Sequence, residues 1–252
     1  MLKLLISTLF PSVTYTQSPQ PAKPAKQSRP RHNVVVAPTS KRKAHAAPRS
    51  AAPAGKFHCP DRLALVAFDQ EARLVAPFMD SFDARFVSAV QALPDQVRGS
   101  VTNIAAGLTM ANNLLADQHP GLLRRIWLLS DGYPNPAKQP IDSAVSRALA
   151  QRTNINTVGI GQPGDFDRFL LERIANRTHN GRFAEAQTVA DLGLIFEGAA
   201  KRQRPGSHRG EATVFVVDVS GSMLGAMGSD RRIDAVRDAM LGLLRYKQAR
   251  WA

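Results

Sequence analysis

Regular alternation of apolar runs and amphipathic segments constrains the fold of residues 61–252 more than any other feature of this sequence. Uninterrupted apolar runs, such as ALVAF at 64–68 and IWLL at 126–129, are typical of strands buried on both faces. Between them lie segments such as 81–93, whose apolar residues recur every three or four positions and predict helices. This alternation predicts a parallel, doubly wound α/β sheet with helices on both faces.

Six strands and six helices are expected in this part of the chain. The expected strands are at 61–68, 73–78, 124–130, 155–161, 181–186 and 213–220. The expected helices are at 81–93, 103–118, 141–152, 164–177, 188–201 and 231–252. The strand at 73–78 is expected to be a short one.

Basic charge is concentrated at the amino-terminal end. The net charge is +13, but residues 1–56 hold ten Lys and Arg and no Asp or Glu, which leaves 23 basic and 20 acidic residues elsewhere. Because residues 1–56 are rich in Pro and Ala and bury little, we expect a disordered tail. A solvated linker is favoured, and electrostatic contact with nucleic acid or anionic lipid is the alternative. No aromatic platforms are interleaved with its cluster of charges, so we expect no specific nucleic-acid binding.

Cysteine content and hydropathy bear on the compartment. Cys59 is the only cysteine, which excludes an intrachain disulfide and fits a reducing compartment. Residues 1–18 resemble a weak signal peptide, but no small-residue cleavage motif follows closely. The cytoplasm is slightly favoured and export stays open. We expect no transmembrane segment, since no run approaches the roughly 18–20 apolar residues that a spanning helix needs.

Five oxygen-bearing side chains stand where an expected strand ends or an expected helix begins. They are Asp218, Ser220 and Ser222 after one apolar run, Asp131 after a second, and Thr102 just before a helix. Ligands of open α/β sheets bind beyond the carboxyl ends of the strands, so the three loops can meet at one edge. Two carboxylates and three hydroxyls suit a hard divalent cation such as Mg²⁺.

The segments VFVVDVSGSML, GSVTNIAAGL and RRIWLLSDG together resemble the metal-ion-dependent adhesion site of the von Willebrand factor type A (vWA) family. The resemblance implies that Ser220, Ser222 and Thr102 bind Mg²⁺ directly or through water, with Mn²⁺ or Ca²⁺ as alternatives. It implies that Asp218 and Asp131 either bind the cation directly or contact the residues and water molecules that bind it. In the family, one coordination position is left for an acidic residue of a partner protein.

The order of these segments departs from the family. The Asp-x-Ser-x-Ser strand normally comes first, whereas here residues 57–200 resemble everything from the second strand to the last helix. A polar break at 201–211 follows, and residues 212–252 resemble the first strand and first helix. A circularly permuted domain and a fragment of a tandem array both fit this order. Since residues 57–200 alone would lack a central strand, we expect 212–252 to fill the gap, in cis or in a swapped dimer, with an incomplete fold as the alternative.

The predicted fold is therefore a Rossmann-like α/β domain of the vWA type. Its mostly parallel six-stranded sheet would have the family order 3-2-1-4-5-6, with a short antiparallel edge strand. The first strand and first helix would come from the carboxyl-terminal segment.

The implied function is divalent-metal-dependent binding of a partner protein, without catalysis by this chain. An alternative is a vWA subunit of an ATP-driven complex such as a metal chelatase. Its AAA+ type ATPase would be a separate polypeptide, because this sequence contains no Walker A motif. An esterase is not expected, since Ser220 lies in VSGSM, which lacks the first glycine of the G-x-S-x-G nucleophile elbow.

Overall fold

The structure is a computed structural model that describes residues 61–81, 83–201 and 210–251. The expected tail at 1–56, Cys59 and most of the expected break at 201–211 lie outside these residues. None of the helices in the described part of the chain has the length and hydropathy that a membrane span requires.

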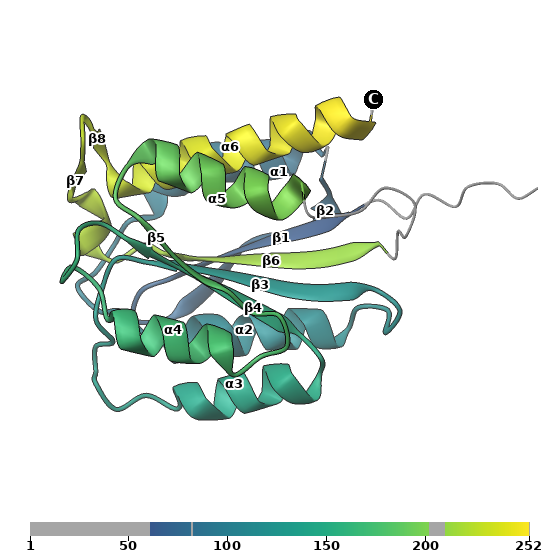
Figure 1. Cartoon of the computed structure of the whole chain (residues 1–252), viewed down its shortest axis with the longest axis horizontal. Coiled ribbons are helices and arrows are strands. Elements are labelled where there is room, and N and C mark those ends of the chain that lie inside the picture. The colour runs from purple at the N-terminus through teal and green to yellow at the C-terminus, as the bar shows by residue number, and fades with distance from the viewer. Residues whose placement is uncertain (1–60, 82, 202–209, 252) are drawn as a thin grey trace, which may run out of the picture. The chain divides into compact units, whose positions relative to one another are not determined.

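Six strands form one sheet in the order β2-β1-β6-β3-β4-β5 (Figure 1). They are β1 (Arg62–Phe68), β2 (Ala72–Asp80), β3 (Leu123–Ser130), β4 (Asn154–Ile160), β5 (Phe183–Ala186) and β6 (Glu211–Asp218). Every neighbouring pair is parallel except β1 and β2, which are antiparallel. The expected mostly parallel sheet is confirmed, and its order is 3-2-1-4-5-6 when β6 is counted as the first strand.

Helices cover both faces of the sheet (Figure 1). They are α1 (Ala84–Gln91), α2 (Ile104–Ala116), α3 (Ile141–Ala150), α4 (Arg168–Asn176), α5 (Val189–Lys201) and α6 (Arg232–Trp251). On one face α1, α5 and α6 pack over the first hydrophobic cluster, and on the other α2, α3 and α4 pack over the second. The doubly wound arrangement follows from the alternation of strand and helix along the chain.

Strand β6 lies at the centre of the sheet although it comes last in the chain. All eight of its residues are buried, and it pairs along its length with β1 on one side and β3 on the other. Its side chains alternate between the two cores: Phe215 and Val217 belong to the first cluster, and Val214 and Val216 to the second. A strand buried on both faces needs this continuous apolar run.

Close packing of α2 against the sheet depends on Gly107. A Cβ atom there would lie 2.7 Å from Val216 Cγ1 and 3.0 Å from Phe68 Cδ1. The helix backbone can therefore approach β6 and β1 only because this position has no side chain. This close packing determines how far the amino-terminal end of α2 lies from the carboxyl ends of the central strands.

Some local features differ from the sequence prediction. The edge strand β2 has nine residues rather than the expected short run at 73–78. Pro77 does not end it, because Pro77 falls in a register irregularity between the Leu63–Met79 and Leu65–Ala76 pairs, where a missing N–H breaks no ladder bond. Four short elements were not expected: the 3₁₀ helices η1 (Leu93–Gln96) and η2 (Gly221–Leu224), and the hairpin of β7 (Ala226–Met227) and β8 (Asp230–Arg231). Strand β6 starts at Glu211, the last residue assigned to the break.

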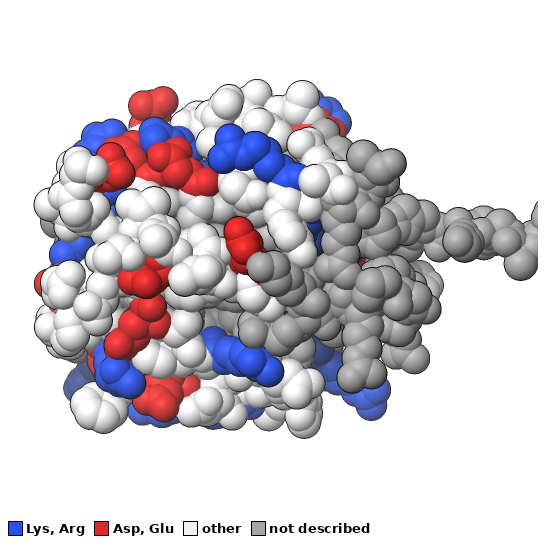
Figure 2. Space-filling model, turned by 45° about the horizontal axis from the view of Figure 1, so that its top comes forward, with Lys and Arg blue, Asp and Glu red and all other residues white. Residues whose placement is uncertain are grey.

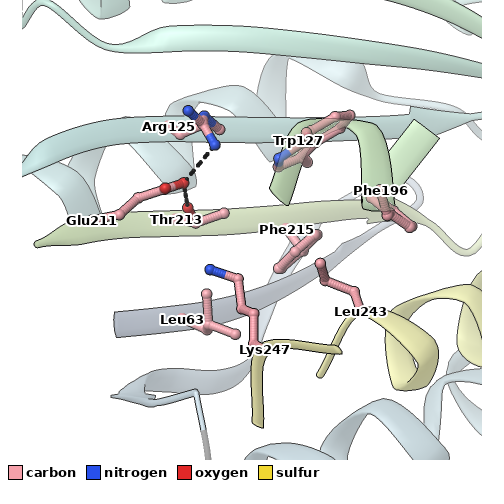
Figure 3. A pocket seen from close by; sticks show the side chains of 10 residues that line it. Leu63, Arg125, Trp127, Phe196, Glu211, Thr213, Phe215, Leu243 and Lys247 are labelled. Carbon is pink, nitrogen blue, oxygen red and sulfur yellow. Dashed lines mark hydrogen bonds and ion pairs between the residues drawn. The ribbon is translucent and has the colours of Figure 1, made fainter. Parts of the chain in front are cut away.

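A cluster of polar groups lies at the amino-terminal ends of the central strands, about 23 Å from the carboxyl end of β6. Glu211 accepts hydrogen bonds from Thr213 Oγ1 at 2.5 Å and makes an ion pair with Arg125 at 2.8 Å (Figure 3). Beside them is a small hollow with apolar walls that include Trp127 and Phe215. This edge is thus distinct from the one that carries the predicted site residues.

Acidic and basic side chains are interspersed on the face seen in Figure 2. Around the start of α6, Arg231 of β8 and Arg237 of α6 both pair with Asp234, at 2.5 and 2.8 Å. Arg237 also pairs with Asp238 at 2.8 Å. The described residues on this face therefore do not present a field of a single sign.

Candidate metal centre

The predicted site residues lie together at the carboxyl edge of the sheet. Asp218 ends β6, Asp131 follows β3, and these strands are neighbours. Thr102 precedes α2, whose N-cap Asn103 accepts a hydrogen bond from the N–H of Ala106. The topology therefore brings together segments that lie far apart in the sequence.

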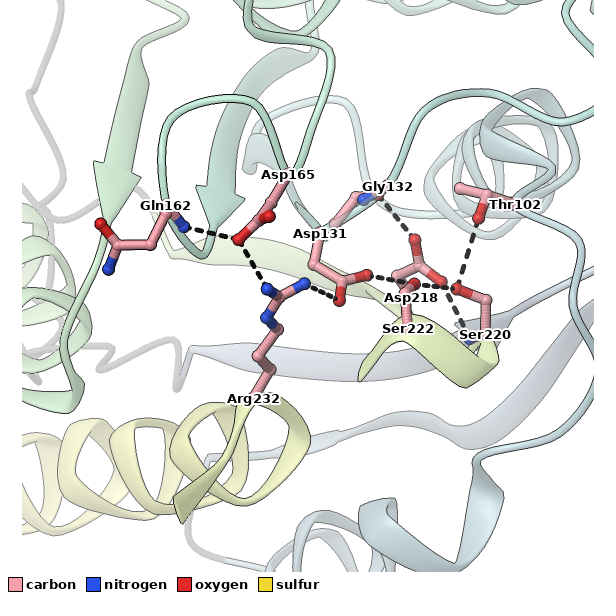
Figure 4. Close-up of polar contacts among 10 residues, drawn as sticks. Thr102, Asp131, Gly132, Gln162, Asp165, Asp218, Ser220, Ser222 and Arg232 are labelled. Carbon is pink, nitrogen blue, oxygen red and sulfur yellow. Dashed lines mark hydrogen bonds and ion pairs between the residues drawn. The ribbon is translucent and has the colours of Figure 1, made fainter. Parts of the chain in front are cut away.

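Asp218, at the end of β6, is a buried carboxylate of the site. It is fully buried, and one of its carboxyl oxygens accepts the Ser220 N–H at 2.9 Å (Figure 4). The other accepts the Ser130 hydroxyl at 2.6 Å. Burial raises the pKa of Asp218 to about 7; the Ser130 hydrogen bond opposes this shift and the charge of Asp131 adds to it. A divalent cation nearby would favour the ionised form.

Three hydroxyl groups form a chain that ends on Asp131 (Figure 4). Ser222 donates to Asp131 Oδ1 at 2.7 Å, Ser220 Oγ lies 3.0 Å from Ser222 Oγ, and Thr102 donates to Ser220 at 3.3 Å. A hydroxyl has one proton to give. Since Ser222 gives its proton to Asp131, Ser220 must donate to Ser222, and every hydroxyl keeps lone pairs for another ligand.

Asp131 is buried and accepts from two sides. Ser222 binds Oδ1, and Arg232 Nη1 lies 2.8 Å from Oδ2. Burial raises the pKa of Asp131, while the hydrogen bonds from Arg232 and Ser222 oppose that shift. The second carboxylate of the site is thus held in a fixed orientation by partners on both of its oxygens.

Arg232 extends the network away from the hydroxyl groups. It is the first residue of α6, and its Nη2 lies 2.6 Å from Asp165 Oδ2. The same oxygen accepts the N–H of Gln162 at 2.7 Å (Figure 4). One guanidinium therefore connects the start of α6 with the loops that follow β3 and β4.

Two glycines shape the backbone around the hydroxyl groups. Gly99 has a φ of +62°, which favours glycine, and its carbonyl accepts the Gly221 N–H at 3.0 Å. A Cβ atom on Gly132 would lie 3.0 Å from Thr102 Oγ1. The carbonyl of Thr102 is held in turn by Gln139 Nε2 at 2.7 Å. Thr102 is thus fixed from both its backbone and its side chain.

The hydroxyl oxygens lie close enough together to face one small hard cation. The contacts between them measure 3.0 Å for Ser220 with Ser222 and 3.3 Å for Thr102 with Ser220, which are hydrogen-bond distances. Mg²⁺ prefers such oxygen ligands. Among the described residues no three His, Cys, Asp or Glu side chains form a metal cluster, so this donor set depends on hydroxyl oxygens. Thr102, Ser220 and Ser222, with Asp131 and Asp218 beside them, could hold such a cation.

The sequence matches a known protein family. Residues 58–198 match the model of the von Willebrand factor type A domain, which covers more than half of the sequence. The chain belongs to the von Willebrand factor type A domain family. The match includes Thr102 and Asp131 of this vWA domain but ends before β6, which carries Asp218.

Two solved structures resemble the vWA chain. An uncharacterized membrane spanning protein from Vibrio fischeri is 28% identical, with a TM-score of 0.29, over 57% of this chain and 77% of its own. Proximal thread matrix protein 1 from the mussel byssus is 24% identical, with a TM-score of 0.41, over 56% of this chain and 34% of its own. No curated protein matches the sequence.

All five predicted site residues lie together, but three of their neighbours were not predicted to belong to the site. Ser130 lies in the segment RRIWLLSDG, and its place directly before Asp131 was a signal. Arg232 also carried a signal, because a basic residue at the start of a helix is disfavoured by the helix dipole unless it has an acidic partner. Asp165 was expected only within a helix, and it lies in the loop before α4.

Proposed function

We propose that this vWA domain binds one divalent cation, with Mg²⁺ as the expected ion. The bound cation would then bind an acidic side chain of a partner protein. Thr102, Ser220 and Ser222 would supply hydroxyl oxygens, while Asp218 and Asp131 supply negative charge. The chain would have no catalytic activity of its own. The observation that carries the proposal is the chain of three hydroxyls that ends on the buried Asp131, with the buried Asp218 accepting the backbone N–H of Ser220 beside it.

Electrostatics supports a cation at this place. Two carboxylates are buried at the ends of adjacent strands, and burial raises the pKa of both. Without a cation, ionising both groups is costly, because buried like charges repel each other in a poorly solvated site. When bound, the cation would compensate these charges and act as a Lewis acid toward the partner's carboxylate.

Exposure supports access by a protein. Ser222 is exposed, in contrast to the buried Ser220 and Thr102, so the chain of hydroxyls reaches solvent at one end. Two large exposed side chains follow site residues in sequence: Leu224 is 48% exposed and Tyr133 is 55% exposed. Apolar and aromatic side chains beside a polar centre are typical of protein interfaces. Protein interaction is also the general role of vWA domains.

We also propose that the domain is circularly permuted. The family match at 58–198 stops before β6, yet β6 fills the centre of the sheet and α6 packs on the same face as α1 and α5. Without β6, the facing edges of β1 and β3 would leave backbone groups unpaired in the core. These contacts favour completion of the domain by its own carboxyl-terminal segment over a fragment of a tandem array.

Thermal unfolding with and without Mn²⁺ tests the metal assignment. Mn²⁺ at about 100 times its dissociation constant stabilises the folded protein by about 2.7 kcal/mol and raises the melting temperature. The variant Asp218→Asn keeps the shape of the side chain and loses the charge, so its melting temperature is expected to be insensitive to Mn²⁺. Asp117→Asn is the matched control, since Asp117 is exposed at the other end of α2 and should leave the Mn²⁺ effect intact. An equal Mn²⁺ effect in Asp218→Asn would overturn the assignment.

A further inference from the structure

One side chain beside the candidate metal centre has no role in the function proposed above. Arg232 makes two ion pairs with its two terminal nitrogens, to Asp131 at 2.8 Å and to Asp165 at 2.6 Å (Figure 4). Its side chain is only 14% exposed, while that of Asp131 is completely buried. A guanidinium in this position is a fixed positive charge beside a cation site.

The loops hold this guanidinium closely. A Cβ atom on Gly161, which has a φ of +116°, would lie 3.1 Å from Arg232 Cζ, and one on Gly225 would lie 3.3 Å from it. The backbone N–H of Arg232 also donates to the Gly225 carbonyl at 2.9 Å. Two residues without side chains thus leave room for the group, and its orientation is set by contacts on both sides.

The contacts of Asp131 explain what the guanidinium does. One oxygen of Asp131 accepts the Ser222 proton, and the other accepts from Arg232. A carboxylate that binds a cation directly must turn an oxygen and its charge toward it. Here one oxygen orients a hydroxyl ligand, and the charge on the other is matched by Arg232.

We propose that Arg232 is a positioning residue that keeps Asp131 from binding the cation directly. The cation would then keep more of its positive charge and one more position for water or for a carboxylate of a partner. Arg232 thereby lowers the affinity of the site for the metal and raises the affinity of the bound metal for the acidic ligand. This inference rests on the proposed function, because it concerns the same site.

Asp165 adjusts the strength of this effect. Its side chain is 34% exposed, so it can be changed without opening the core. While Asp165 shares the guanidinium, part of the positive charge is compensated away from Asp131. Without the carboxylate of Asp165, the guanidinium would act more fully on Asp131 and repel the cation more strongly.

The two changes should therefore shift metal affinity in opposite directions. In Arg232→Gln, Asp131 is released and a like charge is removed, so Mn²⁺ should bind about tenfold more tightly. In Asp165→Asn, Mn²⁺ should bind several-fold more weakly. Arg237→Gln is the control, because Arg237 lies on the same helix and pairs with Asp234 and Asp238 instead. It should leave Mn²⁺ affinity unchanged.

The number of water molecules on bound Mn²⁺ gives a readout that a purely structural role would not change. Electron paramagnetic resonance of the full-length protein with Mn²⁺ in ¹⁷O-enriched water counts them. Arg232→Gln should hold about one water fewer than the wild-type protein, since Asp131 takes that position. Acetate, used as the simplest carboxylate probe, should displace water from the wild-type complex more readily than from Arg232→Gln.

The outcomes separate this inference from the function on which it rests. If wild-type protein binds no Mn²⁺, the proposed function fails and this inference with it. If wild-type protein binds Mn²⁺ but Arg232→Gln binds it equally or more weakly with the same water count, only the role of Arg232 is wrong. Should Arg232→Gln fail to fold, Asp165→Asn decides: weaker binding supports the inference, and unchanged or tighter binding overturns it.

Discussion

Lys247 Nζ lies 2.5 Å from Asp61 Oδ2, although 186 positions separate the two residues in the sequence. Their side chains are only 8% and 10% exposed. The ion pair joins the last helix to the residue that precedes β1. In a chain that began with β6, helix α6 would lead directly into β1, so this contact lies where a permuted domain would have been joined.

Removing one partner of this pair should be costly. Lys247→Met leaves the Asp61 carboxylate largely buried and unpaired, and we expect a loss of about 3 kcal/mol in the free energy of unfolding, measured by urea denaturation. Arg177→Met is the control, because it breaks an exposed ion pair with Asp142 and should cost less than about 1 kcal/mol. A loss as small as the control's would show that the contact between α6 and β1 contributes little.

Rearranging the chain tests the proposed permutation. A polypeptide that starts at residue 210, runs to 251, continues through a short Gly/Ser linker into 61 and ends at 201 keeps every strand contact of the sheet. We expect it to unfold cooperatively, with a free energy of unfolding within about 2 kcal/mol of the original, because chain reconnection changes mainly loop entropy. Its Mn²⁺ affinity should also be preserved.

The complementary truncation should not fold. A chain that ends at residue 201 lacks β6 and leaves the facing edges of β1 and β3 unpaired. We expect no cooperative transition in urea and strong binding of a dye that reports exposed apolar surface. A cooperative transition in this truncated chain would contradict the claim that the domain needs β6 to fold.

The protonation of Asp218 predicts a pH dependence of the metal-free protein. Its folded pKa, about 7, lies above the ordinary value of 3.8, so the folded state binds more protons than the unfolded state between about pH 4 and pH 7. The free energy of unfolding should therefore fall as pH rises through this window. Asp218→Asn should flatten the slope, as measured by urea denaturation in EDTA.

The same protonation predicts that metal binding releases a proton. Below pH 7 the cation must displace a proton from Asp218, so Mn²⁺ affinity should rise with pH up to about 7 and then level off. Calorimetric titrations in two buffers of different ionisation enthalpy measure the proton count. Equal heats in both buffers at pH 6 would contradict a protonated Asp218.

Gly132 offers a test of how closely Thr102 is positioned. In Gly132→Ala the new methyl group would lie 3.0 Å from Thr102 Oγ1, so the hydroxyl must shift by a few tenths of an ångström. Because displacing groups around metal ligands commonly costs 10–100-fold in affinity, we expect Mn²⁺ to bind at least about tenfold more weakly. Gly193→Ala in α5 is the control, since a Cβ atom there meets nothing within 4 Å.

Much of this fold could be predicted because its signals are local. The apolar run at 214–217 is buried in both cores of the sheet, and such a run has few places to lie other than a central strand. The position of Asp218 at the end of that run then fixes the edge where a ligand site can form. Only the tight packing of the sheet was needed to bring Thr102 and Asp131 to the same place.

The network around Asp131 could not be predicted in the same way. Arg232 reaches Asp131 and Asp165 from a third element, across 101 and 67 positions, and no periodic pattern encodes such a meeting. The length of β2 was missed because Pro77 falls at a bulge that only the register of β1 and β2 reveals. The observed site therefore differs from the predicted one in its long-range contacts between single side chains.

Calorimetric titration of the full-length protein with Mn²⁺, at two protein concentrations, tests the central claim most directly. Our account predicts one site per chain with the same affinity at both concentrations, because Thr102, Asp131 and Asp218 come from one assembled domain. An affinity that rises with protein concentration would instead indicate a site completed by a second, swapped chain. No binding by a protein that still melts cooperatively would contradict the metal site.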